Sequence, residues 1–265
     1  PSAPGLIEQI WTFAKYAYLD NPLPSLLKER LFVHLSRFCV VRYCLVRHLG
    51  FLLGRGQPAG DAGAMPETIQ QGRELLTRPL PTEATLDQAL ARMEALRQPE
   101  EIPAPGTELE GELFDALSVM FVAPGKAARV RLAIRNALGD TKLEFLAALL
   151  AFIHAAHFWT EMHPDLGYEP DVVALMNDHP ELAALLPGAD EAQYAQERIR
   201  SISADSLRML PVRIDARQAR LLVEVQHRMR NTLAVIRSIV RRTAETSATT
   251  EDFADHLDGR IGALS

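Results

Sequence analysis

The sequence predicts an all-α fold, and three observations support this class. Apolar residues recur at three- and four-residue spacing along most of the chain, as one face of an amphipathic helix requires. The strict alternation of apolar and polar residues that marks half-buried strands is nearly absent. Proline and glycine gather in short breaks between the periodic stretches, as in residues 54–66 and 98–108.

The periodic stretches predict helices over these ranges: 4–19, 24–54, 66–77, 84–97, 109–121, 125–138, 140–162, 169–177, 190–209, 215–245 and 250–265. The two Pro/Gly-rich breaks end the second and the fourth of these helices, and the stretch MHPDLGYEP (162–170) ends the longest apolar one. Pro211 ends the helix before it, because a proline in a helix interior removes a hydrogen bond. Asp215 and Gln218 form a capping pair that starts the next helix.

Length and composition restrict the class of protein. A chain of 265 residues is long enough for one large domain or two modest ones. The net charge of −6 argues against general binding to nucleic acids or membranes. Two cysteines and no signal-like segment indicate the reducing cytoplasm. The longest apolar run, residues 145–159, is too short and too rich in histidine to span a bilayer.

The chain divides into three parts by composition. Residues 1–188 form a helical domain rich in Leu, Ala and Phe, which we interpret as a sensor domain. Residues 189–214 are polar and helical, as a connector between modules would be. Residues 215–265 form an amphipathic hairpin. The chain begins at Pro1 and stops within an amphipathic pattern, so we expect it to be a truncated piece of a longer protein.

The hairpin's first helix carries an apolar seam and one histidine outside it. The seam follows three- and four-residue spacing: Leu222, Val225, Met229, Leu233, Ile236 and Val240. His227 lies about 200° around the helix from its nearest seam residues and therefore points to solvent. Two short helices cannot bury this seam alone, so we expect a four-helix bundle in a homodimer.

The residues around His227 resemble a known signalling motif. The stretch QHRMRNTLA (226–234) resembles the phosphoacceptor box of sensor histidine kinases of the HWE-type and closely related group, which runs His-Arg-x-Lys/Arg-Asn-x-Leu-Ala. Residues 243–265 resemble the turn and second helix of the same group. The resemblance implies that His227 is the phosphoacceptor and that the full protein is a two-component histidine kinase. A surface histidine without function is the alternative.

The chemistry of imidazole suits this role. A neutral ring nitrogen can attack the γ-phosphorus of ATP without first losing a proton. The phosphohistidine can then pass its phosphoryl group to an aspartate of a response-regulator receiver domain. Glu224, one turn earlier, is placed to orient the ring, and Asn231 belongs to the resembling box. Arg228 and Arg230 are placed to screen phosphate charge, or are simply a solvated basic face.

The sequence also predicts what this chain lacks. No glycine-rich ATP lid, asparagine box or DxGxG-type segment is present, so ATP and Mg would be bound by a catalytic domain after residue 265. We expect no cofactor bound by the chain itself, and no kinase activity from it alone. The expected partners are a second copy, a receiver domain and a small-molecule signal, without nucleic acid or membrane. Nucleic-acid binding by the arginine-rich face 217–242 is a weaker alternative.

The stretch LLKERLFVHLSRFCVVRYCLVRHLG (26–50) resembles the core of the helical alkylhydroperoxidase/carboxymuconolactone-decarboxylase-like fold. Redox members of that family carry Glu-x11-Cys-x2-Cys-x3-His. The aligned residues here are Glu29, Val41, Cys44 and His48, so the first cysteine is replaced. The resemblance implies an alkylhydroperoxidase-like sensor domain.

Cys44 leaves three alternatives open. Cys39 is five residues away and about 140° around one continuous helix, which disfavours a disulfide and dithiol turnover. A thiol-dependent peroxidase or a redox sensor using Cys44 remains the alternative to signalling, helped if His48 lowers the thiol pKa. The third alternative is a small buried side chain beside a Glu29–His48 pair.

A second polar cluster lies on the long apolar helix. His154, His157 and Glu161 share one face, at spacings of three and four residues. Such spacing is acceptable for a metal, but we expect none there. The residues are interpreted either as the polar wall of a small-molecule pocket or as plain structure, with Phe158 and Trp159 adjacent.

Overall fold

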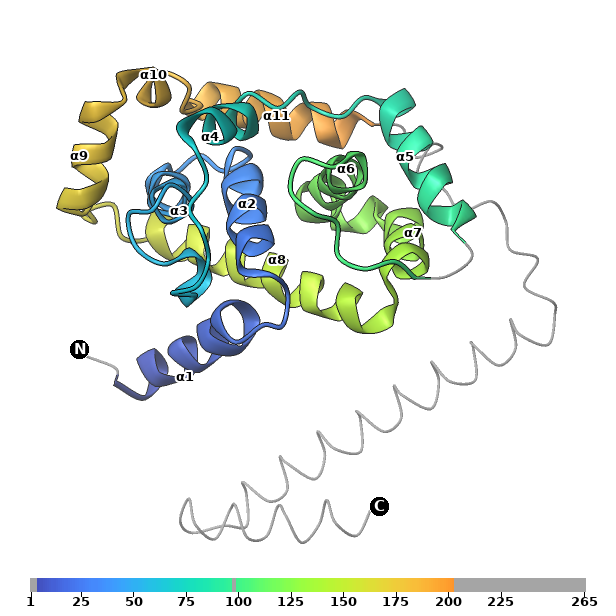
Figure 1. Ribbon diagram of the computed structural model, residues 1–265, viewed down its shortest axis with the longest axis horizontal. Coiled ribbons are helices and arrows are strands. Elements are labelled where there is room, and N and C mark those ends of the chain that lie inside the picture. The colour runs from blue at the N-terminus through green and yellow to red at the C-terminus, as the bar shows by residue number, and fades with distance from the viewer. Residues whose placement is uncertain (1–3, 97–98, 203–265) are drawn as a thin grey trace, which may run out of the picture. The chain divides into compact units, whose positions relative to one another are not determined.

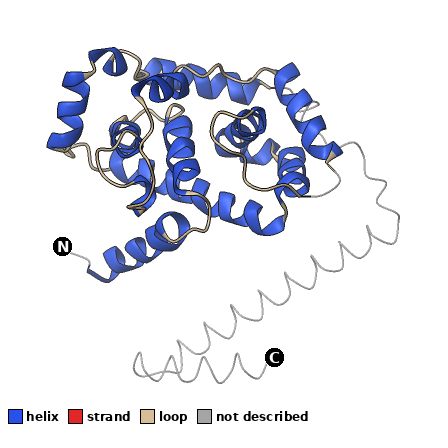
Figure 2. Cartoon of the chain, viewed as in Figure 1, coloured by secondary structure: helices blue, strands red, loops and turns tan. Residues whose placement is uncertain are grey.

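The structure is a computed structural model that describes residues 4–96 and 99–202 (Figure 1). Every regular element in these ranges is helical and none is a strand, which confirms the predicted all-α class (Figure 2). The chain divides into two units, residues 1–209 and 210–265, and all described residues belong to the first. The predicted hairpin 215–265 and the second part of the predicted connector, residues 203–214, lie outside the described residues.

The described residues form eleven α-helices: α1 Pro4–Ala14, α2 Ser25–Ser36, α3 Tyr43–Leu52, α4 Ile69–Leu76, α5 Glu83–Ala95, α6 Glu108–Val122, α7 Ala128–Leu138, α8 Asp140–Glu161, α9 Pro170–Asp178, α10 Pro180–Ala183 and α11 Ala189–Ser201. A π-helical turn, η1 (Lys15–Leu19), continues α1. Two 3-10 turns complete the set, η2 (Pro58–Gly60) and η3 (Pro124–Lys126).

Helix α2 lies at the centre of the domain and contacts α3, α4, α6 and α8 (Figure 1). Ten consecutive residues of this helix, Leu27 to Ser36, are buried, so it has no solvent face. Its charged side chains must therefore find partners inside the protein. Lys28 does so by donating from Nζ to three backbone oxygens, those of Tyr18, Leu19 and Asn21, at 2.7 to 3.0 Å.

The single helix predicted over 24–54 is wrong, because the structure breaks it into α2 and α3 at residues 37–42. The break contains no glycine or proline and is fixed by distant contacts. Gln196 Nε2 donates to the oxygen of Phe38 at 2.6 Å, and Arg37 donates to the oxygen of Leu75 at 3.2 Å. Cys39 therefore lies in a loop, and its predicted position on the same helix as Cys44 is corrected.

Helix α8 matches its predicted range of 140–162 closely. Gly139, with φ of 85°, separates it from α7, and only glycine adopts this backbone conformation without strain. Leu146, Leu149 and Ile153 of α8 are fully buried in the core. Among the described helices α8 meets the length and composition of a membrane span, but core helices of soluble proteins meet the same test.

Candidate functional site

The described part of the candidate site centres on a buried Glu29–His48 pair, which joins α2 to α3. Glu29 is fully buried, and its Oε2 lies 2.8 Å from Nδ1 of His48. Its Oε1 accepts hydrogen bonds from the Tyr18 hydroxyl and, at 2.7 Å, from the backbone N–H of Ala59. Both carboxylate oxygens are therefore satisfied, as burial of a carboxylate demands. Ala59 presents its N–H from a turn with a φ of 47°.

Aromatic rings enclose this pair. The His48 ring stacks on Phe32, and the Tyr18 ring packs edge-on against His48. Burial and the adjacent Glu29 carboxylate raise the pKa of Tyr18 above its usual range, so the phenol stays protonated and donates. The three polar groups of Tyr18, Glu29 and His48 thus form a closed network that ties η1, α2 and α3 together.

Cys44 does not take part in that network. Its Sγ lies 3.7 Å from the Thr160 hydroxyl, and burial raises its pKa to about 11. Burial likewise raises the pKa of Cys39 to about 12, and both cysteines are free. Because the thiolate is the reactive form, less than about 0.1% of either thiol is reactive at neutral pH. The structure therefore gives no support to a peroxidase that uses Cys44.

A cavity of about 400 Å³ is lined by all three members of the predicted cluster, His154, His157 and Glu161. Its walls come from the α2–α3 loop, the C-terminal end of α6, the C-terminal half of α8 and helix α11. The remaining lining residues are Phe38, Cys39, Val40, Val41, Phe121, Val122, Phe158, Gln196 and Arg200. A mostly apolar wall with a few polar groups is typical of small-molecule sites of this size.

The two histidines of the cavity are held by specific partners. His157 is buried, and its Nε2 lies 2.7 Å from the Ser36 hydroxyl. Burial and the nearby His48 and His154 lower its pKa to about 3, although the backbone of Val41 opposes the shift. His154 donates from Nε2 to the backbone oxygen of Phe121 at 3.0 Å, and its imidazole ring stacks on the Phe121 ring. Burial lowers its pKa as well, so both rings are neutral at pH 7.

These partners do not make a metal site. Among residues 4–96 and 99–202, no group of three or more His, Cys, Asp or Glu side chains is placed to hold a metal ion. The cluster instead supplies hydrogen-bonding groups and an exposed carboxylate, Glu161, to the cavity.

The low pKa of His157 predicts a pH-dependent loss of stability. A histidine in the unfolded chain takes up a proton below about pH 6.5, whereas the buried ring does not until about pH 3. The unfolded state thus binds more protons in this window, so stability falls as the pH falls. We expect His157 to account for a loss on the order of 2 kcal/mol between pH 7 and pH 5. Urea unfolding of wild type and His157→Gln at both pH values measures it.

The exposed His163, just after α8, provides the matched control. His163→Gln should keep the wild-type difference between the two pH values, while His157→Gln should lose most of it. Equal pH dependence in wild type and His157→Gln would contradict the buried, neutral state of this ring.

Two charge networks in the core had no counterpart among the sequence predictions. Arg30 on α2 binds two carboxylates, each through both of its oxygens: Glu67 at 2.7 and 2.8 Å and Glu110 at 2.7 and 2.9 Å. Burial raises the pKa of Glu67, although the Arg30 charge opposes the shift. The partners lie 37 and 80 residues from Arg30, so no local pattern indicates the cluster.

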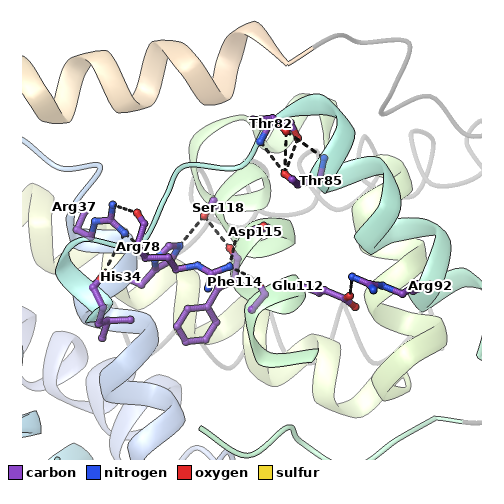
Figure 3. A network of polar contacts seen from close by, with 12 residues as sticks. His34, Arg37, Arg78, Thr82, Thr85, Arg92, Glu112, Phe114, Asp115 and Ser118 are labelled. Atoms are coloured by element: carbon purple, nitrogen blue, oxygen red, sulfur yellow. Dashed lines mark hydrogen bonds and ion pairs between the residues drawn. The ribbon is translucent and has the colours of Figure 1, made fainter. Parts of the chain in front are cut away.

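The second network joins α2 to α6 (Figure 3). Ser118 donates to the oxygen of Phe114, so its hydroxyl accepts from Nε2 of the fully buried His34 at 2.8 Å. Arg37 donates to the backbone oxygen of Arg78, whose guanidinium binds Asp115 at 2.7 Å. Burial and the surrounding arginines hold the pKa of His34 well below its ordinary value. We interpret both networks as structural, since their charged groups are paired with one another.

The predicted phosphotransfer residues lie outside the described residues. They are His227, Glu224, Arg228, Arg230 and Asn231. Their assignment rests on the sequence, which can be compared with known protein families. Residues 224–265 match the family model described as HWE histidine kinase.

We call residues 224–265, which are similar to this family, the HWE histidine kinase segment. Histidine kinases use ATP, generally form homodimers and communicate with response regulators in two-component systems. No curated protein and no solved structure matches the chain. The similarity concerns residues 224–265 alone, and the relationship of residues 1–188 to the alkylhydroperoxidase-like fold stays a prediction.

Proposed function

We propose that this chain is the sensory and phosphoacceptor portion of a cytoplasmic two-component histidine kinase. The match of residues 224–265 to the HWE histidine kinase family carries this proposal. His227 accepts the γ-phosphoryl group of ATP on a ring nitrogen, ADP leaves, and the phosphohistidine then passes the group to an aspartate of a receiver domain. ATP and Mg²⁺ are bound by a catalytic domain, and not by the residues of this chain.

The residues around His227 support the two transfers in different ways. Arg228 and Arg230 place positive charge where the phosphoryl oxygens arrive, which favours a step that depends mainly on positioning and charge. Asn231 belongs to the same box, and Glu224 orients the ring from one turn away. Residues 215–265 of two copies form the four-helix bundle that presents both phosphoacceptors.

The cavity that contains His154, His157 and Glu161 is the site for the signal. One of its walls is α11, through Gln196 and Arg200, and this helix is the first half of the predicted connector (189–214). A molecule bound in the cavity contacts α11 and thereby favours one position of the connector over another. Differential affinity of this kind is what a ligand needs to shift a two-state equilibrium.

The test of phosphotransfer uses the whole 265-residue chain with a histidine kinase catalytic domain supplied in trans. With γ-labelled ATP and Mg²⁺, the chain should become labelled, and the label should be lost in acid but kept in alkali, as a phosphohistidine is. Adding a receiver domain should then move the label from the chain to the receiver. Label that resists acid would contradict transfer through histidine.

The sensory role predicts that filling the cavity changes the rate of labelling. Val41 lines the cavity, and Val41→Phe places a bulkier side chain in it. We expect the initial labelling rate to change at least threefold, because the new ring presses on the walls that a ligand would contact. Val173→Phe on α9, an exposed position outside the cavity, is the matched control and should leave the rate unchanged. Equal rates for both variants, with native circular dichroism, would contradict this role of the cavity.

A further inference from the structure

Helix α1 is strongly amphipathic, and its apolar side is uncovered. At 100° per residue, six apolar residues fall within an arc of about 160°. They are Leu6, Ile7, Ile10, Trp11, Phe13 and Ala14. The polar residues Glu8, Gln9 and Thr12 occupy the opposite side. A helix with this pattern normally turns its apolar arc to a core, yet residues 5–13 of α1 are all exposed.

The domain itself covers little of this arc. The ring of Phe13 packs edge-on against Phe152 of α8, and it is still 41% exposed. Trp11 is 59% exposed and Leu6 is 56% exposed. We call the surface formed by the apolar residues of this arc, from Leu6 to Ala14, the α1 patch.

The α1 patch has the size of a functional apolar patch. An aromatic side chain carries ~150–250 Å² of surface and an aliphatic one somewhat less, and the five large apolar side chains of the arc are on average a little under half exposed, which gives on the order of 400 Å². The largest apolar patch on a typical monomer is ~300–600 Å² and is often functional, and each partner of a standard protein interface buries ~800 Å². The patch therefore supplies about half of one side of a standard protein interface.

Charge distinguishes a protein partner from a membrane. Helices that lie on anionic membranes carry several Lys and Arg along their polar face, whereas residues 4–16 contain one, Lys15. Lys15 and Glu8 are the two charges of this stretch, and both lie on the polar side. Two apolar arcs that face each other therefore meet no like-charge repulsion. Histidine kinases generally form homodimers, and within such a dimer the second copy of the patch is present at a high effective concentration.

We propose that the α1 patch is a homodimer interface, in which α1 of one copy packs against α1 of the second around a twofold axis. An isologous contact of this kind buries the same residues on both copies. It gives the N-terminal domain its own dimer contact, separate from the expected bundle of residues 215–265. The proposal concerns assembly only, and it stands or falls independently of phosphoryl transfer to His227.

Site-specific photo-cross-linking of the full chain tests the interface. Trp11, in the apolar arc, is replaced by p-benzoylphenylalanine, and ¹⁵N-labelled and unlabelled copies are mixed before irradiation. We expect covalent dimers whose cross-linked peptides join residue 11 to residues 4–16 of the other copy. The same photo-label at Thr12, on the polar side, is the matched control and should give at least fivefold less product.

Two substitutions on the same helix separate the interface from general effects. Ile7→Glu places a charge in the apolar arc and should abolish the cross-link from position 11, whereas Gln9→Glu adds the same charge on the polar side and should keep it. Cross-links within one chain, cross-links to residues 203–265, or cross-linking to added phosphatidylcholine vesicles in place of a second copy would each overturn the proposal.

Discussion

Replacing His227 with glutamine is expected to reduce phosphoryl labelling of the chain by at least ~10³-fold, to the level of a reaction without the chain. The amide of glutamine is similar in size and polarity to imidazole but has no nitrogen lone pair that can attack phosphorus. The loss should therefore appear in the chemical step and not in assembly. The measurement is the initial rate of label transfer from γ-labelled ATP, with the catalytic domain supplied in trans.

Two histidines of the N-terminal domain, the exposed His163 and the half-buried His179, provide the control. His163 follows α8, and His179 lies between α9 and α10. His163→Gln and His179→Gln should label at the wild-type rate, because neither belongs to the HWE histidine kinase segment. Wild-type labelling of His227→Gln would show that another residue accepts the phosphoryl group and would remove the central assignment.

Replacing Arg30 with methionine is expected to lower the free energy of unfolding by ~3–5 kcal/mol, the cost of leaving buried charges without their partner. Glu67 and Glu110 would then face each other without the guanidinium that neutralises both. Methionine keeps most of the side-chain volume, so the loss reports charge more than packing. Since a domain of this size is stable by ~5–15 kcal/mol, urea unfolding at pH 7 should resolve the change clearly.

The pH dependence of Arg30→Met separates this explanation from a packing defect. Burial raises the pKa of Glu67 and the Arg30 charge opposes that shift, so removing Arg30 lets Glu67 take up a proton more readily as the pH falls. The variant should therefore recover stability relative to wild type near pH 4.5. Arg135→Met removes an exposed pair with Asp140 and should cost only ~0–1 kcal/mol. A loss of equal size at pH 7 and pH 4.5 would contradict the charge argument.

Local sequence predicted most helices because their boundaries depend on local chemistry. The predicted range 140–162 differs from α8 by one residue, since Gly139 and the proline-containing stretch 162–170 punctuate it on both sides. Residues 37–42 carry no such signal. Helix periodicity passes through them, and only contacts with Leu75 and Gln196 show why the chain turns there. Breaks imposed by distant partners are invisible to local periodicity.

The candidate site shows the same division. Spacing alone placed His154, His157 and Glu161 on one face, and the structure finds all three lining one cavity. The family motif aligned Glu29 with His48, and the structure places them in contact. Tyr18 and Ala59 complete that network from other segments of the chain. The residue spacing around Glu29 does not predict either contact. Whether a residue such as Cys44 is reactive depends on its surroundings, which one sequence does not specify.

The complete burial of α2 has a consequence for the motions of the domain. An amide in Leu27–Ser36 cannot reach solvent by the fraying of one helix, because every side of α2 is covered by others. Its hydrogen exchange should therefore require global unfolding, whereas α1, which the rest of the domain leaves exposed, should exchange through local opening in a single copy. The domain thus combines a slowly exchanging centre with a first helix whose protection depends on a second copy, so rearrangements at its surface need not disturb the core.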